Sequence, residues 1–94
     1  MLIRIVKMTF VPEKVNSFIS VFHEHKNLIA SSTGCNGVEL LRDISNPNIF
    51  FTYSKWTNEN SLEKYRKSEL FNEVWSDVKK WFADKPEAWG VKEV

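Results

Sequence analysis

The sequence predicts a single α+β domain in which four antiparallel strands form one sheet and the helices cover one face of it. Apolar residues recur with a period of two in some stretches and with helical spacing in others, in the order strand, helix, strand, strand, helix, strand. The polar turn Ser45-Asn46-Pro47-Asn48 joins two alternating stretches, which is typical of an antiparallel hairpin. The chain has 94 residues, 43% hydrophobic and 27% charged, the composition of one modest globular domain without repeats or linkers.

The first predicted strand covers residues 2–10 and is stopped by Pro12. Pro12 suits the first turn of a helix, where its missing N–H group costs nothing, and Glu13 suits the positive end of the helix dipole. An amphipathic helix of about five turns follows, and Thr33-Gly34 provides its C-terminal stop. The apolar stripe of this helix consists of Val15, Phe18, Ile19, Phe22 and Ile29.

The predicted hairpin is formed by strands over residues 36–44 and 49–56. Thr57 or Asn58 caps the next helix, and Ser68 begins a new helical segment at an angle after a break. Residues 84–86 end this segment, and a last short strand covers about residues 88–94. The apolar stripe after the break consists of Phe71, Val74, Trp75, Val78 and Phe82.

This order of elements is that of the ferredoxin-like βαββαβ fold, a four-stranded antiparallel sheet with its helices on one face. The first three strands are partly apolar on both faces, as with Phe51 and Tyr53 on one side and Phe50 on the other. An uncovered apolar face on the order of several hundred Å² is rare in monomers. We therefore predict a homodimer in which the sheet faces of two chains pack together.

Charge and cysteine content exclude several classes of partner. The formal net charge is +1 with both signs interspersed, so the sequence has no basic stripe for nucleic acid. No apolar run reaches membrane-spanning length, and Arg4 and Lys7 interrupt the first strand as no signal peptide would allow. Cys35 is the only cysteine, which excludes an intramolecular disulfide and suits a reducing compartment. We expect a soluble, cytoplasmic protein without a membrane or nucleic-acid partner, in which Cys35 is a small buried residue.

Three features in the middle of the chain resemble those of a known family. Gly34-Cys35 turns into a strand with Glu39 at its centre, residues 49–56 end in Trp56, and a helix with a break at Ser68 follows. In this order they resemble the antibiotic biosynthesis monooxygenase (ABM) domains of the dimeric α+β barrel superfamily, over nearly the whole chain. The resemblance implies a homodimer of βαββαβ monomers with a pocket between each sheet and its own helices.

The resemblance also implies an activity. Members of this family include oxygenases that act on phenolic or quinol-like compounds without a metal or flavin, because an electron-rich phenolate can itself pass an electron to O₂. The implied function is a cofactor-independent monooxygenase acting on a small aromatic substrate, and the alternative is a non-catalytic dimer that binds a small ligand. Relatives that degrade heme use a histidine in the last long helix as iron ligand, and residues 71–77 contain none. We therefore expect no heme, metal or other cofactor.

Four residues are candidates for a catalytic role. Trp56 resembles the strand-terminal tryptophan of the family and can stack on a ligand and donate its indole N–H, or it simply packs helix on sheet. Tyr65 stands where many relatives carry histidine; with a usual pKa of about 10 its phenol is a donor rather than a base. His23 and His25 are candidate bases or helix-edge residues, and their spacing does not suit a metal pair.

Five aromatic residues are candidates for substrate binding, although those on a helical stripe are also explained as core. Glu39 and Asp43 share one face of a strand, and Thr52 and Ser54 share one face of the next, so each pair lies either in the pocket or at the dimer interface. The aromatic candidates are Phe22, Phe51, Tyr53, Phe71 and Trp75.

Overall fold

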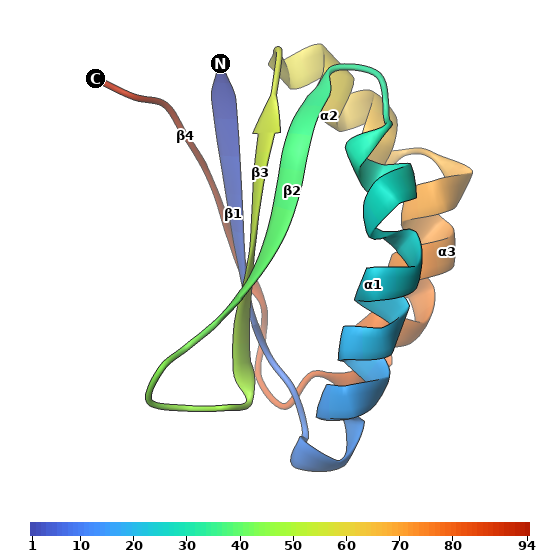
Figure 1. Ribbon diagram of the computed structural model, residues 1–94, viewed down its shortest axis with the longest axis vertical. Coiled ribbons are helices and arrows are strands. Elements are labelled where there is room, and N and C mark those ends of the chain that lie inside the picture. Colours follow the sequence, from blue (N-terminus) through green and yellow to red (C-terminus); the bar gives the residue numbers. More distant parts are fainter.

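The computed structural model describes residues 1–94 and contains the predicted elements in the predicted order. Its sheet is antiparallel throughout with strand order β2-β3-β1-β4, and the three α-helices lie together on one side of it (Figure 1). The ferredoxin-like α+β fold is therefore confirmed. The strands are β1 (Leu2–Thr9), β2 (Cys35–Arg42), β3 (Ile49–Trp56) and β4 (Glu87–Val91), and the helices are α1 (Val15–Ala30), α2 (Glu59–Arg66) and α3 (Glu69–Val78), with 3₁₀ turns at Pro12–Lys14 and Lys79–Trp81.

Two of the helices, α2 and α3, begin at a side-chain cap. The Asn58 side chain accepts a hydrogen bond from the Ser61 N–H at 2.9 Å and begins α2. The Ser68 hydroxyl accepts one from the Phe71 N–H at 3.1 Å and begins α3, so the predicted break at this serine is confirmed. Gly34 follows α1 with φ +81°, a conformation that side chains with a Cβ rarely adopt.

The last helix and the outer strands are shorter than predicted. The prediction that the helix continues to residues 84–86 is wrong, because the chain leaves it at Val78 and passes through a 3₁₀ turn. Phe82 then forms a bridge with Phe10, and the Ala83 N–H donates to the Thr9 carbonyl at 2.7 Å. Because Phe82 and Ala83 form these bonds with the sheet, the helix does not continue through them. Strand β2 also ends earlier, and Cys35 is half-buried rather than buried.

The strand register decides which side chains face the helices. Thr52 pairs with Val6, Ser54 with Arg4 and Trp56 with Leu2, and the β3 residues of this set are all buried under the helices. Phe51 and Tyr53 alternate with them and therefore lie on the opposite face of the sheet. The register thus resolves the question of faces that the sequence left open.

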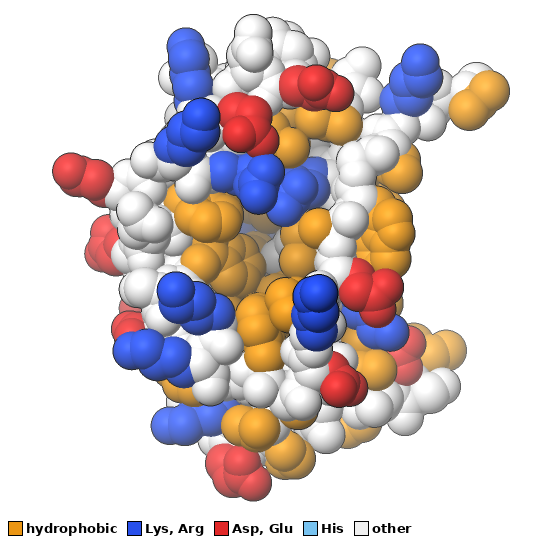
Figure 2. Space-filling model, turned by 180° about the vertical axis from the view of Figure 1, so that it is seen from behind, with side chains coloured by type: hydrophobic (Ala, Val, Ile, Leu, Met, Phe, Trp, Pro, Cys, Tyr) orange, Lys and Arg blue, Asp and Glu red, His pale blue; other side chains and the backbone are white.

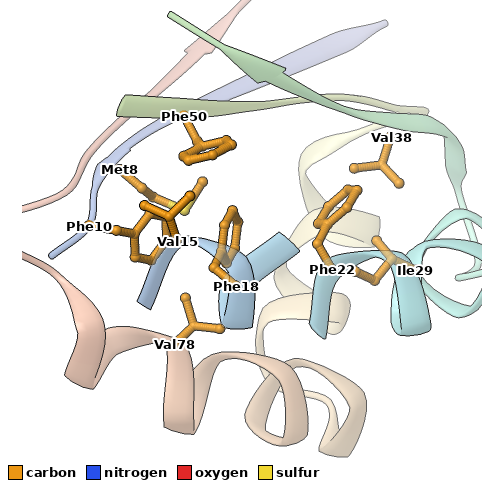
Figure 3. Packing of buried hydrophobic residues seen from close by; sticks show 9 residues of the cluster. All are labelled: Met8, Phe10, Val15, Phe18, Phe22, Ile29, Val38, Phe50 and Val78. Atoms are coloured by element: carbon orange, nitrogen blue, oxygen red, sulfur yellow. The ribbon is translucent and has the colours of Figure 1, made fainter. Parts of the chain in front are cut away.

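A cluster of buried side chains joins the two layers (Figure 3). Phe10 stacks on Phe18 with ring centroids 4.2 Å apart, and Phe18 meets Phe50 edge-on at 5.5 Å. Burying each such ring stabilises the fold by about 1.5–3 kcal/mol. The cluster consists of Met8, Phe10, Val15, Phe18, Phe22, Ile29, Val38, Phe50 and Val78.

The opposite face of the sheet carries no helix (Figure 1) and is markedly apolar. On it Leu41, Trp89 and Val91 are 50%, 43% and 41% exposed, and Phe51 and Tyr53 are half-buried. None of the helices combines the length and the apolar character needed to cross a membrane.

Candidate functional site

A cavity of about 270 Å³ lies between the sheet and its helices. Figure 2, which shows the molecule from behind the view of Figure 1, shows a hollow with hydrophobic side chains inside it and Lys and Arg side chains around its edge. Eleven of its sixteen lining residues are hydrophobic, and none is Asp, Glu or His. The volume lies near the lower end of the range for small-molecule sites, which suits a compound of one or two rings.

Aromatic side chains from β3, α1, α2 and α3 form much of the cavity wall. Trp56, at the end of β3, is 1% exposed and stacks on Tyr65 of α2 with ring centroids 5.1 Å apart. Tyr65 meets Phe71 edge-on at 5.3 Å, and Phe71 contacts Trp75 at 6.1 Å. These contacts join the rings into one wall, and Phe22 from α1 also lines the cavity.

The indole N–H of Trp56 is already used within the protein. It donates a buried hydrogen bond to the Ser54 Oγ at 2.9 Å. An indole has a single N–H donor, and in this arrangement Ser54 accepts it, so a ligand would have to replace Ser54 to receive that hydrogen bond. Trp56 contributes the surface of its ring and the position of the Ser54 hydroxyl.

The Tyr65 hydroxyl is held at the cavity by Trp75. Its oxygen accepts a hydrogen bond from the Trp75 Nε1–H at 3.3 Å, which leaves its own proton free to donate. Burial raises the pKa of Tyr65 above its usual 10.0, and the hydrogen bond from Trp75 and the positive charge of Arg4 only partly oppose this. Tyr65 is therefore a neutral donor at neutral pH.

Four cavity residues with polar groups were not predicted as site residues on their own: Arg4, Thr52, Ser54 and Lys79. Their alternation in the sequence puts Thr52 and Ser54 on a common strand face, and the structure turns that face to the cavity. Arg4 had a visible signal, because it interrupts an alternating set that is otherwise apolar. Lys79 had none, because its position depends on where α3 ends.

Neither histidine lines the cavity. His23 is exposed on α1. His25 donates from Nδ1 to the Val21 carbonyl at 2.8 Å, and its Nε2 lies 3.6 Å from a Glu73 carboxylate oxygen on α3. Of the two alternatives that the sequence left open, the structure shows the helix-edge position for both histidines, outside the cavity lining.

Two of the predicted substrate-binding residues also lie outside the cavity. Phe51 and Tyr53 project from the open face of the sheet, because they alternate with the cavity residues of β3. The structure does bring together Phe22, Phe71 and Trp75 with Trp56 and Tyr65. No group of three or more His, Cys, Asp or Glu side chains is placed to hold a metal ion.

Comparison with solved structures shows the same fold in distant relatives. A crystal structure of an antibiotic biosynthesis monooxygenase is 17% identical, with a TM-score of 0.93 over 100% of this chain and 99% of the other. A conserved protein from Methanosarcina mazei Go1 is 23% identical, with a TM-score of 0.92 over 100% and 94%. A putative antibiotic biosynthesis monooxygenase from Nitrosomonas europaea is 14% identical, with a TM-score of 0.92 over 100% and 99%.

At the level of sequence, no curated protein matches the chain. The profile of the family described as antibiotic biosynthesis monooxygenase matches residues 1–77, which include every helix-facing strand residue of β1, β2 and β3 and nearly all of α3. The chain therefore belongs to the antibiotic biosynthesis monooxygenase family.

Proposed function

We propose that the protein is a cofactor-independent monooxygenase that oxidises a small phenolic or quinol-like compound in the cavity between sheet and helices. Family membership supports a monooxygenase type of function. The observation that carries the proposal is the cavity itself, a predominantly apolar space walled by aromatic rings that also presents the Tyr65 hydroxyl and the Arg4 guanidinium. Such a site can hold a planar ring and bind one oxygen of it.

The proposed reaction takes its electrons from the substrate. When a phenol is oxidised to a quinone, O₂ supplies one oxygen atom to the ring, and the second leaves as water with two hydrogens of the substrate. Tyr65 donates a hydrogen bond to the substrate oxygen, and the aromatic wall orients the ring and excludes water. Because no Asp, Glu or His lines the cavity, a substrate that is already deprotonated is favoured.

Oxygen uptake by the purified, metal-free protein with a panel of dihydroxyaromatic compounds tests this proposal. We expect at least one compound to be consumed faster by the wild type and by the exposed-surface control Lys64→Gln than by Trp56→Phe. If the wild type consumes none of the compounds faster than Trp56→Phe does, the monooxygenase proposal fails for those substrates.

The second candidate is a non-catalytic dimer that binds a small ligand. The absence of Asp, Glu and His from the cavity lining favours it, because no general base of the usual kinds is present there. Saturable binding of the same compounds, measured calorimetrically, without oxygen uptake under any condition would support this alternative over the monooxygenase.

We also propose that two chains form a homodimer through their open sheet faces. Members of this family are generally dimeric, and the apolar face bearing Leu41, Trp89 and Val91 has no helix over it. Sedimentation should show a dimer at micromolar concentration and a shift toward monomer in Phe51→Glu, which places a charge on that face. A monomeric wild type at that concentration contradicts the proposal.

A further inference from the structure

We propose that Arg4 forms an oxyanion subsite in the cavity, and that the ligand is therefore an aromatic compound carrying a phenolate or carboxylate group. This inference rests on the proposed function for the location of the ligand, and it adds the chemical class of that ligand. It also assigns a role to the one arginine that lines the cavity.

The position of Arg4 is set by the sheet. It lies in the middle of β1, paired with Ser54 of β3 on one side and with Gly90 of β4 on the other. All three residues belong to the helix-facing set, so the side chain of Arg4 is directed under the helices. The guanidinium-bearing side chain lines the cavity, whereas the space above Gly90 is occupied by the Leu2 side chain, whose Cδ1 would lie 3.3 Å from a Cβ at that position.

Arg4 has no partner within the protein. None of the four ion pairs in the structure includes it, and none of the side-chain hydrogen bonds uses its nitrogen atoms. The residue is nevertheless half-buried, and burial lowers the pKa of Arg4. A desolvated guanidinium normally has an acidic or carbonyl partner. An unpaired one at an apolar cavity is therefore prepared for an anion from outside.

The charges nearby add to this preference. Arg66, at the end of α2, is near enough to lower the pKa of Arg4 further, and Glu63 opposes this effect. The Glu63 carboxylate, however, is bound to Arg66 at 2.9 Å. Lys79 contributes a further positive charge to the lining, and Figure 2 shows Lys and Arg side chains around the hollow. The cavity therefore attracts anions.

Neutral donors at the same site can complete the binding of an oxyanion. The Ser54 hydroxyl accepts from Trp56 and keeps its own proton to donate, and the Tyr65 hydroxyl does the same beneath Trp75. Several donors and one cation around a single oxygen favour its ionised form. Arg4 thus offers a way to hold a phenolate at neutral pH in a cavity lined by no carboxylate or imidazole base.

Binding of 4-nitrophenol tests the phenolate form of this proposal, because the phenol is colourless and its phenolate is yellow. An apolar cavity alone would raise the pKa of the bound phenol, whereas a cation beside it lowers that pKa by about one to three pH units. Absorbance titrations should show a lowered pKa with the wild type and with Lys64→Gln, and a raised pKa with Arg4→Met. Arg4→Lys, which keeps the charge, should retain part of the lowering.

Calorimetry with 1-naphthoate and its neutral isostere 1-naphthamide tests the carboxylate form. A charge-assisted hydrogen bond corresponds to a preference of about 10- to 100-fold for naphthoate. We expect this preference for naphthoate in the wild type and in Lys64→Gln. Arg4→Met should lose the preference, while its affinity for naphthamide stays within about twofold of that of the wild type. A positive result in only one of the two assays identifies phenolate or carboxylate as the recognised group.

Three results would overturn the subsite. The first is that the wild type binds naphthoate and naphthamide with equal affinity and also does not lower the pKa of 4-nitrophenol. The second is that neither anion binds at millimolar concentration. The third is that the preference for naphthoate and the lowered pKa of 4-nitrophenol both survive in Arg4→Met. The wild-type comparisons remain decisive if Arg4→Met does not fold. Neither probe assay requires turnover, so oxygen uptake with neutral quinols can succeed while the subsite fails, and the reverse is equally observable.

Discussion

The buried hydrogen bond between Trp56 and Ser54 provides a direct test of how the cavity wall is built. The Ser54→Ala substitution removes the acceptor of the indole N–H and changes little else, because Ser54 is only 7% exposed and Ala retains its Cβ. Trp56 is 1% exposed, so the orphaned N–H cannot simply turn to bulk solvent.

The expected cost follows from the desolvation of one donor. An unsatisfied buried polar group destabilises a protein by about 1–3 kcal/mol. Ser54 lines the cavity, which can admit a water molecule to the vacated position, so we expect the lower part of that range, about 1–2 kcal/mol. For a domain of this size this corresponds to a fall in Tm of roughly 4–16 °C.

Urea denaturation at one fixed protein concentration measures this cost, since association shifts apparent stability. The decisive control is the double-mutant cycle with Trp56→Phe, which removes the donor. In that background Ser54→Ala should cost less than about 0.5 kcal/mol, because no N–H remains to be orphaned. If Ser54→Ala destabilises Trp56→Phe as much as it destabilises the wild type, the hydrogen bond is not the source of the effect and the reasoning is refuted.

Three further predictions concern the turn, the phenol and the histidines. Gly34→Ala should lower the free energy of unfolding by about 1–2 kcal/mol because of the positive φ at this position, and by more because the new Cβ would clash with Ser61. In a denaturation assay Ser61→Gly should relieve the part due to the clash. If Gly34→Ala costs as much in the Ser61→Gly background, there is no clash. The pKa of Tyr65 in the folded state is raised above 10.0, so its contribution to the free energy of unfolding is complete below pH 10 and falls as the pH rises toward the folded pKa. Tyr65→Phe should lose less stability over that interval. An equal loss in Tyr65→Phe would show that ionisation of Tyr65 is not the cause. His23→Ala and His25→Ala should keep oxygen uptake within about twofold of the wild type, since neither lines the cavity, and a loss of about tenfold or more from either would place a base where the structure does not.

Much of the fold was predictable because its signals are local. The alternation in β3, the asparagine cap at Asn58 and the serine break at Ser68 each depend on neighbours within a few residues, and the structure confirms all three. The end of α3 was not predictable in this way. Phe82 and Ala83 leave the helical path because they bond to Phe10 and Thr9 at the end of β1, which lies far away in the sequence.

The site was predictable in part, for the same reason. Trp56, Tyr65 and Trp75 carry sequence signals of their own, and the structure places them in one wall. The histidines and the aromatic residues Phe51 and Tyr53 have side chains suited to a site, but suitability of type does not decide direction. A period of two places alternate residues of β3 on opposite faces, and only packing against the helices decides which face encloses the cavity.

By itself the sequence determined the order of elements, the βαββαβ class and the family, because periodicity, capping and turn chemistry act over short distances. The tertiary structure alone decided that the Trp56 N–H is consumed by Ser54 and that Arg4 lies unpaired at the cavity. Both facts depend on which groups meet across strands and layers. The balance between desolvation and pairing that makes Arg4 an anion site therefore exists only in the folded chain.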